Sequence, residues 1–238
     1  MMNTISVPKI SYGLGYTLSM PTHDTDDLPL LVYLHGAGER GTDLSHISRN
    51  AIPRLISEGR DFPALILCPQ CPAEYVWDNI VDQVKALIDK IVAQYEIKKD
   101  RICLTGSSMG GFGTVAMAMT YRSFFSAIAP VAGGGMVWRC NNLLNTPVYA
   151  VHGEQDDIVP YICSQMLVDA LRELGATVLF KLLPQRNHTT GIESAYEETD
   201  LIPWLLRQRR TNLPSCRKPS QNYSEDFYSF PENSMTGS

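Results

Sequence analysis

The stretch Arg101-Ile-Cys-Leu-Thr-Gly-Ser-Ser-Met-Gly-Gly-Phe-Gly113 joins an apolar, β-prone run to a segment rich in small residues that is expected to be a buried helix. At its centre, Gly106-Ser-Ser-Met-Gly110 is a G-x-S-x-G pattern, placed where the strand should turn into the helix. In such a turn the serine takes a strained conformation, and small neighbours let strand and helix approach without Cβ clashes. The pattern predicts that Ser108 is a nucleophile held on a strand–helix elbow. The alternative is a plain glycine-rich turn.

A nucleophilic serine needs a histidine that takes its proton and a carboxylate that orients the histidine. After an elbow of this kind the chain order is serine, acid, histidine. Of the five histidines, His152 leaves too little room for a separate acid, so His188 is the predicted base. It lies in the polar stretch Pro184–Gly191, directly after the apolar run Thr177–Leu183. The alternative is a loop histidine that is hydrogen-bonded to solvent.

The acid must lie between the serine and the histidine, where two groups of carboxylates are available. Those in 162–174 fall among apolar residues at helical spacing and are expected on a solvated helix face. The other group, Glu154, Asp156 and Asp157, follows the apolar strand expected over 147–152. Asp156 is the predicted acid and Asp157 the alternative. Spacing alone does not separate them, because either could instead cap a helix or hold the loop.

The oxyanion of a tetrahedral intermediate needs backbone N–H donors. The N–H of Met109 is expected to be free at the start of the helix, where donors are unpaired and the helix dipole favours negative charge. A second donor should come from the loop after an earlier strand, here His35-Gly-Ala-Gly38. Ala37 is the predicted second donor, with Gly36 or Gly38 as alternatives. The remaining interpretation is a plain glycine turn.

Apolar runs alternate with segments of helical spacing along the chain. Strands are expected within 9–20 (one or two) and over 30–35, 64–68, 102–105, 126–131, 148–152 and 177–183; helices are expected over 51–58, 80–95, the elbow segment, the 160s and 194–208. This alternation predicts an α/β fold with a mostly parallel, doubly wound sheet and helices on both faces. All the catalytic candidates then fall at carboxyl ends of strands, where ligands bind in such sheets.

Several motifs are shared with one superfamily of hydrolases. They are Leu34–Gly41, Cys68–Pro72, Trp77, Asp100–Arg101, Leu104–Gly113, Ala129–Gly134, His152–Pro160 and Ile202–Arg209. The chain resembles the α/β-hydrolase superfamily over about residues 10–210. Within it, the chain resembles the phospholipase/carboxylesterase and dienelactone-hydrolase-like group, and is most similar to proteins described as predicted peptidases or feruloyl-esterase-like hydrolases. The resemblance implies Ser108 as nucleophile, Asp156 as acid and His188 as base. One departure is Asn187, where glycine often precedes the histidine.

The segments expected to surround the site are Glu39–His46, Gln70–Trp77, Gly133–Leu144 and Gln185–Gly191. None is long enough to form a large helical lid domain, so we expect an open cleft that takes soluble substrates. Trp77 and Trp138 are candidates to stack on an aromatic or sugar group in this pocket, beside Gly36 and Gly38. For each tryptophan the alternative is packing within the fold.

The composition fits one domain followed by a tail. The chain has 238 residues, of which 44% are hydrophobic and 19% charged, which indicates a packed core rather than disorder. We expect a single α/β-hydrolase domain over 1–210. The polar segment 211–238 has no apolar periodicity and is predicted to be a disordered tail. A net charge of −5 argues against a nucleic-acid-binding surface or an anionic membrane as partner.

The predictions of location and cofactors depend on the absence of targeting, membrane-spanning and metal-binding patterns in the sequence. Met1–Lys9 has no apolar core of a signal peptide, and no run is long enough to span a bilayer. This predicts a cytoplasmic protein, unless a leader precedes Met1. The six cysteines are scattered and expected to be reduced there. Cys68 and Cys71 have C-x-x-C spacing but no second pair, so no zinc or other metal site is expected.

Together these features predict a serine hydrolase that cleaves carboxylic esters of small soluble molecules through an acyl-enzyme, without metal or cofactor. A serine peptidase and an acyl thioesterase would use the same residues. A non-catalytic binding protein on the same fold is the alternative from another class. Acyl and alcohol specificity and the oligomeric state are not determined by the sequence, because fold does not fix them.

Overall fold

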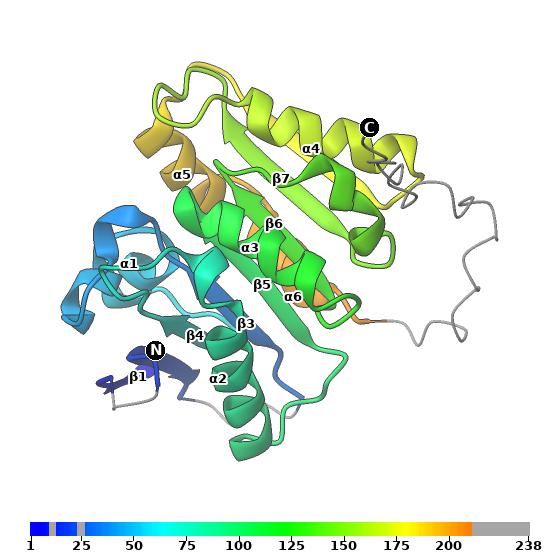
Figure 1. The fold of residues 1–238 in the computed structure, drawn as a ribbon. Helices are drawn as coiled ribbons and strands as arrows, with labels where there is room; N and C mark the ends of the chain where they lie inside the picture. The colour runs from blue at the N-terminus through cyan, green and yellow to red at the C-terminus, as the bar shows by residue number, and fades with distance from the viewer. Residues whose placement is uncertain (10–12, 23–26, 211–238) are drawn as a thin grey trace, which may run out of the picture.

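The computed structural model describes residues 1–9, 13–22 and 27–210, and these form one eight-stranded sheet covered by helices (Figure 1). In space the strands follow the order β1-β2-β4-β3-β5-β6-β7-β8. Their bounds are β1 Met2–Val7, β2 Tyr16–Pro21, β3 Leu30–Leu34, β4 Leu65–Pro69, β5 Ile102–Ser107, β6 Ala127–Val131, β7 Val148–Gly153 and β8 Val178–Leu183.

Parallel pairing dominates the sheet. β1 pairs with β2 and β2 with β4 in antiparallel fashion, whereas every pair from β4–β3 to β7–β8 is parallel. Strands β3, β4, β5, β6 and β7 are buried along their whole length. Continuous apolar strands of this kind need cover on both faces. The prediction of a mostly parallel α/β sheet is confirmed.

Helices cover both faces of the sheet (Figure 1). On one side α2 (Val81–Gln94), α3 (Met109–Thr120) and α4 (Ile162–Glu173) pack on a core cluster that includes Leu104, Ile128 and Val148. On the other side α1 (Ala51–Ser57), α5 (His188–Glu197) and α6 (Leu201–Arg207) pack on a second cluster that includes Ile66 and Cys103. Two separate cores are the signature of a doubly wound fold.

Two elements differ from the expectation. The edge strand β1 was not expected, because its residues are largely exposed and give no apolar pattern; it forms by pairing along β2. The single last helix expected over 194–208 is instead α5 and α6. Pro203 lies in the first turn of α6 and could not continue a helix from α5, because proline lacks the N–H and its ring clashes with the preceding turn.

In the part of the chain that the structure describes, the connections after β3, β4 and β6 add only short 3-10 turns to the helices that cover the sheet. They are η1 (Ala37–Glu39), η2 (Leu44–Arg49), η3 (Trp77–Asn79) and η4 (Val137–Leu143), and none builds a large lid. Among the described residues no helix combines the length and apolar character needed to cross a bilayer. The predicted tail 211–238 lies outside the described residues.

Candidate active site

Ser108 occupies a strained turn between β5 and α3. Its backbone has φ 56° and ψ −120°, a left-handed value of φ that is rare for any residue except glycine. The neighbours must be small for this turn to form. A Cβ on Gly106 would lie 2.4 Å from the carbonyl oxygen of Gly110, and a Cβ on Gly110 would lie 1.9 Å from that of Leu34. The glycines of the G-x-S-x-G pattern are therefore required by close backbone contacts.

A chain of hydrogen bonds connects Ser108 to His188 and Asp156. The Nε2 atom of His188 lies 3.0 Å from Ser108 Oγ, and its Nδ1 atom lies 2.7 Å from Asp156 Oδ2. The Asp156 side chain is fully buried and that of His188 is 15% exposed. The ring faces the hydroxyl through one nitrogen and the carboxylate through the other. An imidazole so placed can take a proton from the serine while the carboxylate orients it.

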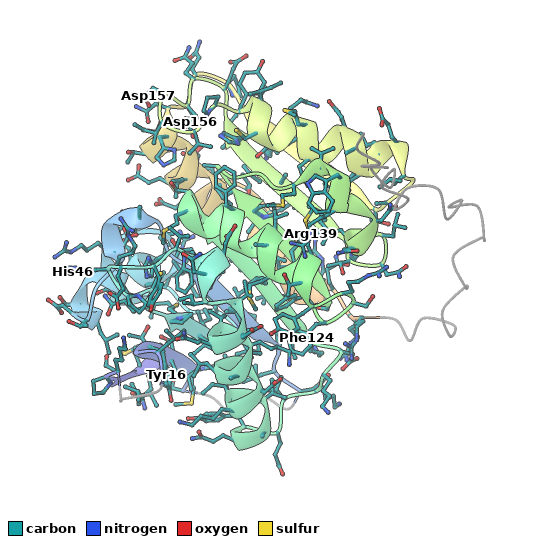
Figure 2. The ribbon with its side chains drawn as sticks, viewed as in Figure 1. Tyr16, His46, Phe124, Arg139, Asp156 and Asp157 are labelled. Carbon is teal, nitrogen blue, oxygen red and sulfur yellow. The ribbon has the colours of Figure 1, made fainter. Side chains whose placement is uncertain are left out.

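Asp156 and Asp157 have different surroundings although they are adjacent in the loop after β7 (Figure 2). Asp156 Oδ1 accepts hydrogen bonds from the backbone N–H groups of Ile158 (3.0 Å) and Val159 (2.8 Å). Asp157 is exposed to solvent. Of the two carboxylates that spacing left open, the geometry brings Asp156 to His188.

Hydrogen-bond donors stabilise the ionised form of Asp156. Burial acts to raise the pKa of this carboxyl, but the hydrogen bonds from His188 and from the N–H groups of Val159 and Ile158 outweigh it. The pKa of Asp156 therefore lies below its ordinary value, because the donors stabilise the ionised form. A carboxylate at this position can stabilise an imidazolium at His188.

Asn187 explains how the histidine loop works without the glycine that often stands there. Its φ is −81°, which any residue adopts, and its side chain accepts a hydrogen bond from the N–H of Thr190 at 3.0 Å. Asn187 is thus the N-cap of α5, and His188 is the first residue of that helix rather than a loop residue. The close approach is made at Gly153 instead, where a Cβ would lie 2.4 Å from the carbonyl oxygen of Arg186.

The two predicted oxyanion donors each begin a helical segment. Met109 is the first residue of α3 and Ala37 the first of η1, positions whose N–H groups lack an intrahelical acceptor. The two segments meet at Gly36, where a Cβ would lie 3.7 Å from the Cβ of Ser108. This proximity brings the loop after β3 beside the serine. Gly38 is exposed, with open space around its Cα.

Trp77 belongs to the support of this loop and not to a substrate surface. Its side chain is fully buried, its Nε1–H donates to the carbonyl oxygen of His35 at 2.9 Å, and its ring meets that of His35 edge-on. A Cβ on Gly113 would lie 2.5 Å from the Cβ of Trp77. Of its two interpretations, pocket wall or packing, the structure supports packing, because no substrate reaches a fully covered ring.

Trp138 is the opposite case. It lies in η4 and is 78% exposed. A pocket of about 280 Å³ lies between η4 and α3; its lining includes Phe112, Met136 and Arg139. Phe112 lies one helical turn from the serine, as its N–H reaches the carbonyl oxygen of Ser108 at 3.2 Å. Exposed and pocket-lining apolar groups therefore lie next to the nucleophile helix.

His152 is the residue of the site that sequence reasoning missed. The histidine that hydrogen-bonds Ser108 is His188, whereas Nε2 of His152 lies 3.2 Å from Oδ2 of Asp156. The available signal was its place at the end of β7, four residues before the acid. Among the described residues, no cluster of three or more His, Cys, Asp or Glu side chains could hold a metal ion.

Comparison with known proteins identifies the family. The family model described as phospholipase/carboxylesterase matches residues 65–197, which include Ser108, Asp156 and His188. The chain belongs to the phospholipase/carboxylesterase family. The match covers more than half of the chain, so the family and the α/β-hydrolase fold that the motifs suggested are both confirmed.

Curated relatives in this range are hydrolases with different printed activities. Over 165 residues, 66% of this chain, it is 26% identical to a bifunctional acetylxylan esterase/xylanase of Neocallimastix patriciarum. It is 28% identical over 137 residues, 54% of this chain, to acyl-protein thioesterase 1 of Neurospora crassa. The chain spans 24% and 53% of the lengths of these two proteins. With the lysophospholipase-like protein 1 of Mus musculus it shares 24% identity, covering 77% of this chain and 87% of that one.

Solved structures agree on the fold. A thermostable esterase superposes with a TM-score of 0.72 at 29% identity, covering 88% of this chain and 63% of that chain. The feruloyl esterase module of Clostridium thermocellum superposes with a TM-score of 0.70 at 14% identity, covering 90% and 92%. At that identity the second likeness shows the fold alone. Family and fold thus point to ester and thioester hydrolases without choosing a substrate.

Proposed function

We propose that this chain is a serine carboxylesterase in which Ser108, His188 and Asp156 form the catalytic triad. The observation that carries the proposal is the pair of hydrogen bonds from Ser108 Oγ to the His188 ring and from that ring to Asp156, at 3.0 and 2.7 Å. A strained, partly exposed serine next to a histidine paired with a buried carboxylate is suited to nucleophilic attack. Family membership supports the same class of chemistry.

In the proposed reaction Ser108 Oγ attacks the ester carbonyl carbon while Nε2 of His188 takes the hydroxyl proton. The negative oxygen of the tetrahedral intermediate accepts hydrogen bonds from the N–H groups of Met109 and Ala37. Collapse breaks the bond to the alcohol oxygen, which leaves with the proton from Nε2. Water then attacks the acyl-serine by the same steps, releasing the acid and restoring the serine hydroxyl. Asp156 holds Nδ1 and stabilises the imidazolium throughout.

The proposed substrates are small soluble esters. The turns over the site in the described residues are short, which supports an open cleft. No step of this mechanism requires a metal or a cofactor. A series of p-nitrophenyl esters of increasing acyl length measures the acyl preference.

The decisive test is covalent labelling by a fluorophosphonate, followed by intact mass and ester turnover. Wild type should gain one adduct, and Ser108→Ala should gain none while retaining its fold by circular dichroism. Asp156→Asn and Asp157→Asn form a matched pair of neighbours: the first should lower kcat by about 10³- to 10⁴-fold, and the second should leave it within about twofold. A folded wild type that takes no label would reject the esterase proposal and favour a binding role.

A thioesterase is the second candidate, favoured by the similarity to two fungal proteins called acyl-protein thioesterase 1. The same triad would cleave a thioester, whose thiolate leaves more easily than an alkoxide. Turnover of an acyl thioester at or above that of the matching oxygen ester would support this candidate. Turnover of aminoacyl anilides above that of esters would instead support a peptidase.

A further inference from the structure

A buried chain of polar groups begins at Asp156 and leads through His152 into the fold. His152 is fully buried at the end of β7, and its Nε2 faces two oxygens: the carbonyl of Val159 at 2.8 Å and Oδ2 of Asp156 at 3.2 Å. A carboxylate and a carbonyl can only accept, so Nε2 carries the hydrogen. The hydrogen bond of Nε2 goes to the Val159 carbonyl in the acid loop, and Oδ2 of Asp156, which accepts from Nδ1 of His188, lies within ion-pair distance of the same nitrogen.

The other nitrogen of His152 leads away from the site. Nδ1 lies 2.7 Å from the hydroxyl oxygen of Ser164 in α4, and that hydroxyl lies 2.7 Å from the carbonyl oxygen of Gly133. Ser164 is also buried. The Ser164 hydroxyl donates its one hydrogen to the carbonyl of Gly133. Burial lowers the pKa of His152, against the opposing effects of the Val159 carbonyl and Asp156.

Gly133 connects this chain of groups to the nucleophile helix. A Cβ on Gly133 would lie 2.6 Å from the carbonyl carbon of Gly111, so the backbone after β6 and the first turn of α3 are in direct contact. Gly111 is itself held by a hydrogen bond from its N–H to the carbonyl oxygen of Ser108 at 2.8 Å. Continuous contacts thus run from the acid loop through α4 to the helix that carries the serine.

We propose that His152 is a positioning residue that orients Asp156 for His188 and, through Ser164 and Gly133, fixes the acid loop against the nucleophile helix. The inference rests on the proposed triad. Its ring takes no proton from the substrate; it fixes the carboxylate and shares its negative charge. Loss of the Nε2–H donor leaves more of that charge to His188 and frees the loop that carries the acid.

Two substitutions at the same position separate the donor from the shape of the ring. His152→Phe keeps a ring but removes both nitrogens, whereas His152→Gln offers an amide N–H near the place of Nε2. His152→Phe should lower kcat by about 10- to 100-fold, since small misplacements of a catalytic group cost that much, with KM within about threefold. His152→Gln should restore kcat to within about fivefold of wild type.

The pH profile distinguishes positioning from a purely structural role. With the donor removed, the acid limb of the kcat/KM profile should move to higher pH by about half a unit, because the less neutralised carboxylate holds the proton on His188 more strongly. A folded His152→Phe variant with the kcat and acid limb of wild type would overturn the proposal, even if its melting temperature fell. Equal losses in the Phe and Gln variants, with no change of the pH profile, would also overturn it.

Ser164→Ala keeps the proposal testable if His152→Phe does not fold. This variant removes only the hydroxyl between His152 and Gly133, and should lower kcat by about 3- to 10-fold. An unchanged kcat would contradict the role of Ser164 in connecting His152 to the nucleophile helix. Fluorophosphonate labelling of wild type is run alongside. Absence of label on wild type would reject the proposed esterase function. A labelled wild type together with His152 variants of unchanged kcat would reject the positioning role alone.

Discussion

His35 is expected to make the protein sensitive to mild acid, and the size of the effect follows from its surroundings. The residue lies at the end of β3 with a fully buried side chain. Its Nδ1–H donates to the carbonyl oxygen of Gly36 at 2.6 Å, and its Nε2 accepts from the N–H of Cys71 at 3.0 Å. Burial lowers the pKa of His35 from 6.5 to about 4, because the ring loses the water that would solvate its charge.

The sign of the effect follows from which state binds the proton first. Between pH 6.5 and about 4 the unfolded chain protonates this histidine while the folded protein does not, so the free energy of unfolding falls as the pH falls. The linkage relation with these two values gives a loss of about 2 kcal/mol between pH 7 and pH 5. The stability that His35 contributes is nearly fully present at pH 7. Well below pH 4 both states are protonated, so His35 causes no further loss in the free energy of unfolding.

Urea unfolding at pH 7 and pH 5 measures this contribution, with His35→Gln as the perturbation and His46→Gln at a partly exposed site as the matched control. The Gln variant should be less stable at pH 7 but should lose about 2 kcal/mol less than wild type between the two pH values. The control should show the wild-type pH dependence. Equal pH dependence in wild type and His35→Gln would refute the reasoning, because the folded protein and the unfolded chain would then protonate this histidine at the same pH.

Two further predictions concern packing around the nucleophile. Gly110→Ala would place its Cβ 1.9 Å from the carbonyl oxygen of Leu34 and should cost several kcal/mol or prevent folding, whereas Gly38→Ala, with nothing within 4 Å, should change the unfolding free energy by less than about 1 kcal/mol; equal stability of the two variants would contradict the close contact. Trp77→Phe removes a buried hydrogen bond and leaves its carbonyl acceptor unpaired, so it should cost about 2 to 4 kcal/mol by chemical denaturation, against less than about 0.5 kcal/mol for the exposed Trp138→Phe. A Trp77→Phe variant as stable as wild type would contradict the packing role and favour Trp77 as a residue of the substrate pocket.

Much of the site could be predicted because its chemistry is local in sequence. The elbow at Ser108 needs glycines at fixed offsets, and this spacing can be recognised in the sequence. The order serine, acid, histidine left one sensible base. Parallel strands place their carboxyl ends at one edge, so a strand pattern alone brings Ser108, the acid loop and His188 to the same edge.

The features that the sequence left undecided depend on contacts between segments far apart in the chain. The choice of Asp156 over Asp157 follows from which of two neighbouring side chains turns inward to His188, and adjacent residues in a loop have no periodicity that reveals it. Trp77 is covered because η3 packs on α3, a contact between residues more than thirty positions apart. The exposed strand β1 gave no signal because its partner, not its own composition, makes it a strand.

The sequence by itself determined the fold class and the positions of Ser108 and His188 at the carboxyl ends of strands, because hydrophobic periodicity and glycine placement are set by residues close together in the chain. Tertiary structure alone decided that Asp156 and not Asp157 faces His188, that Trp77 is buried, and that His152 contacts Asp156. Hydrogen bonds and burial depend on which side chains face one another after the strands are aligned, and that alignment arises from packing across the whole sheet.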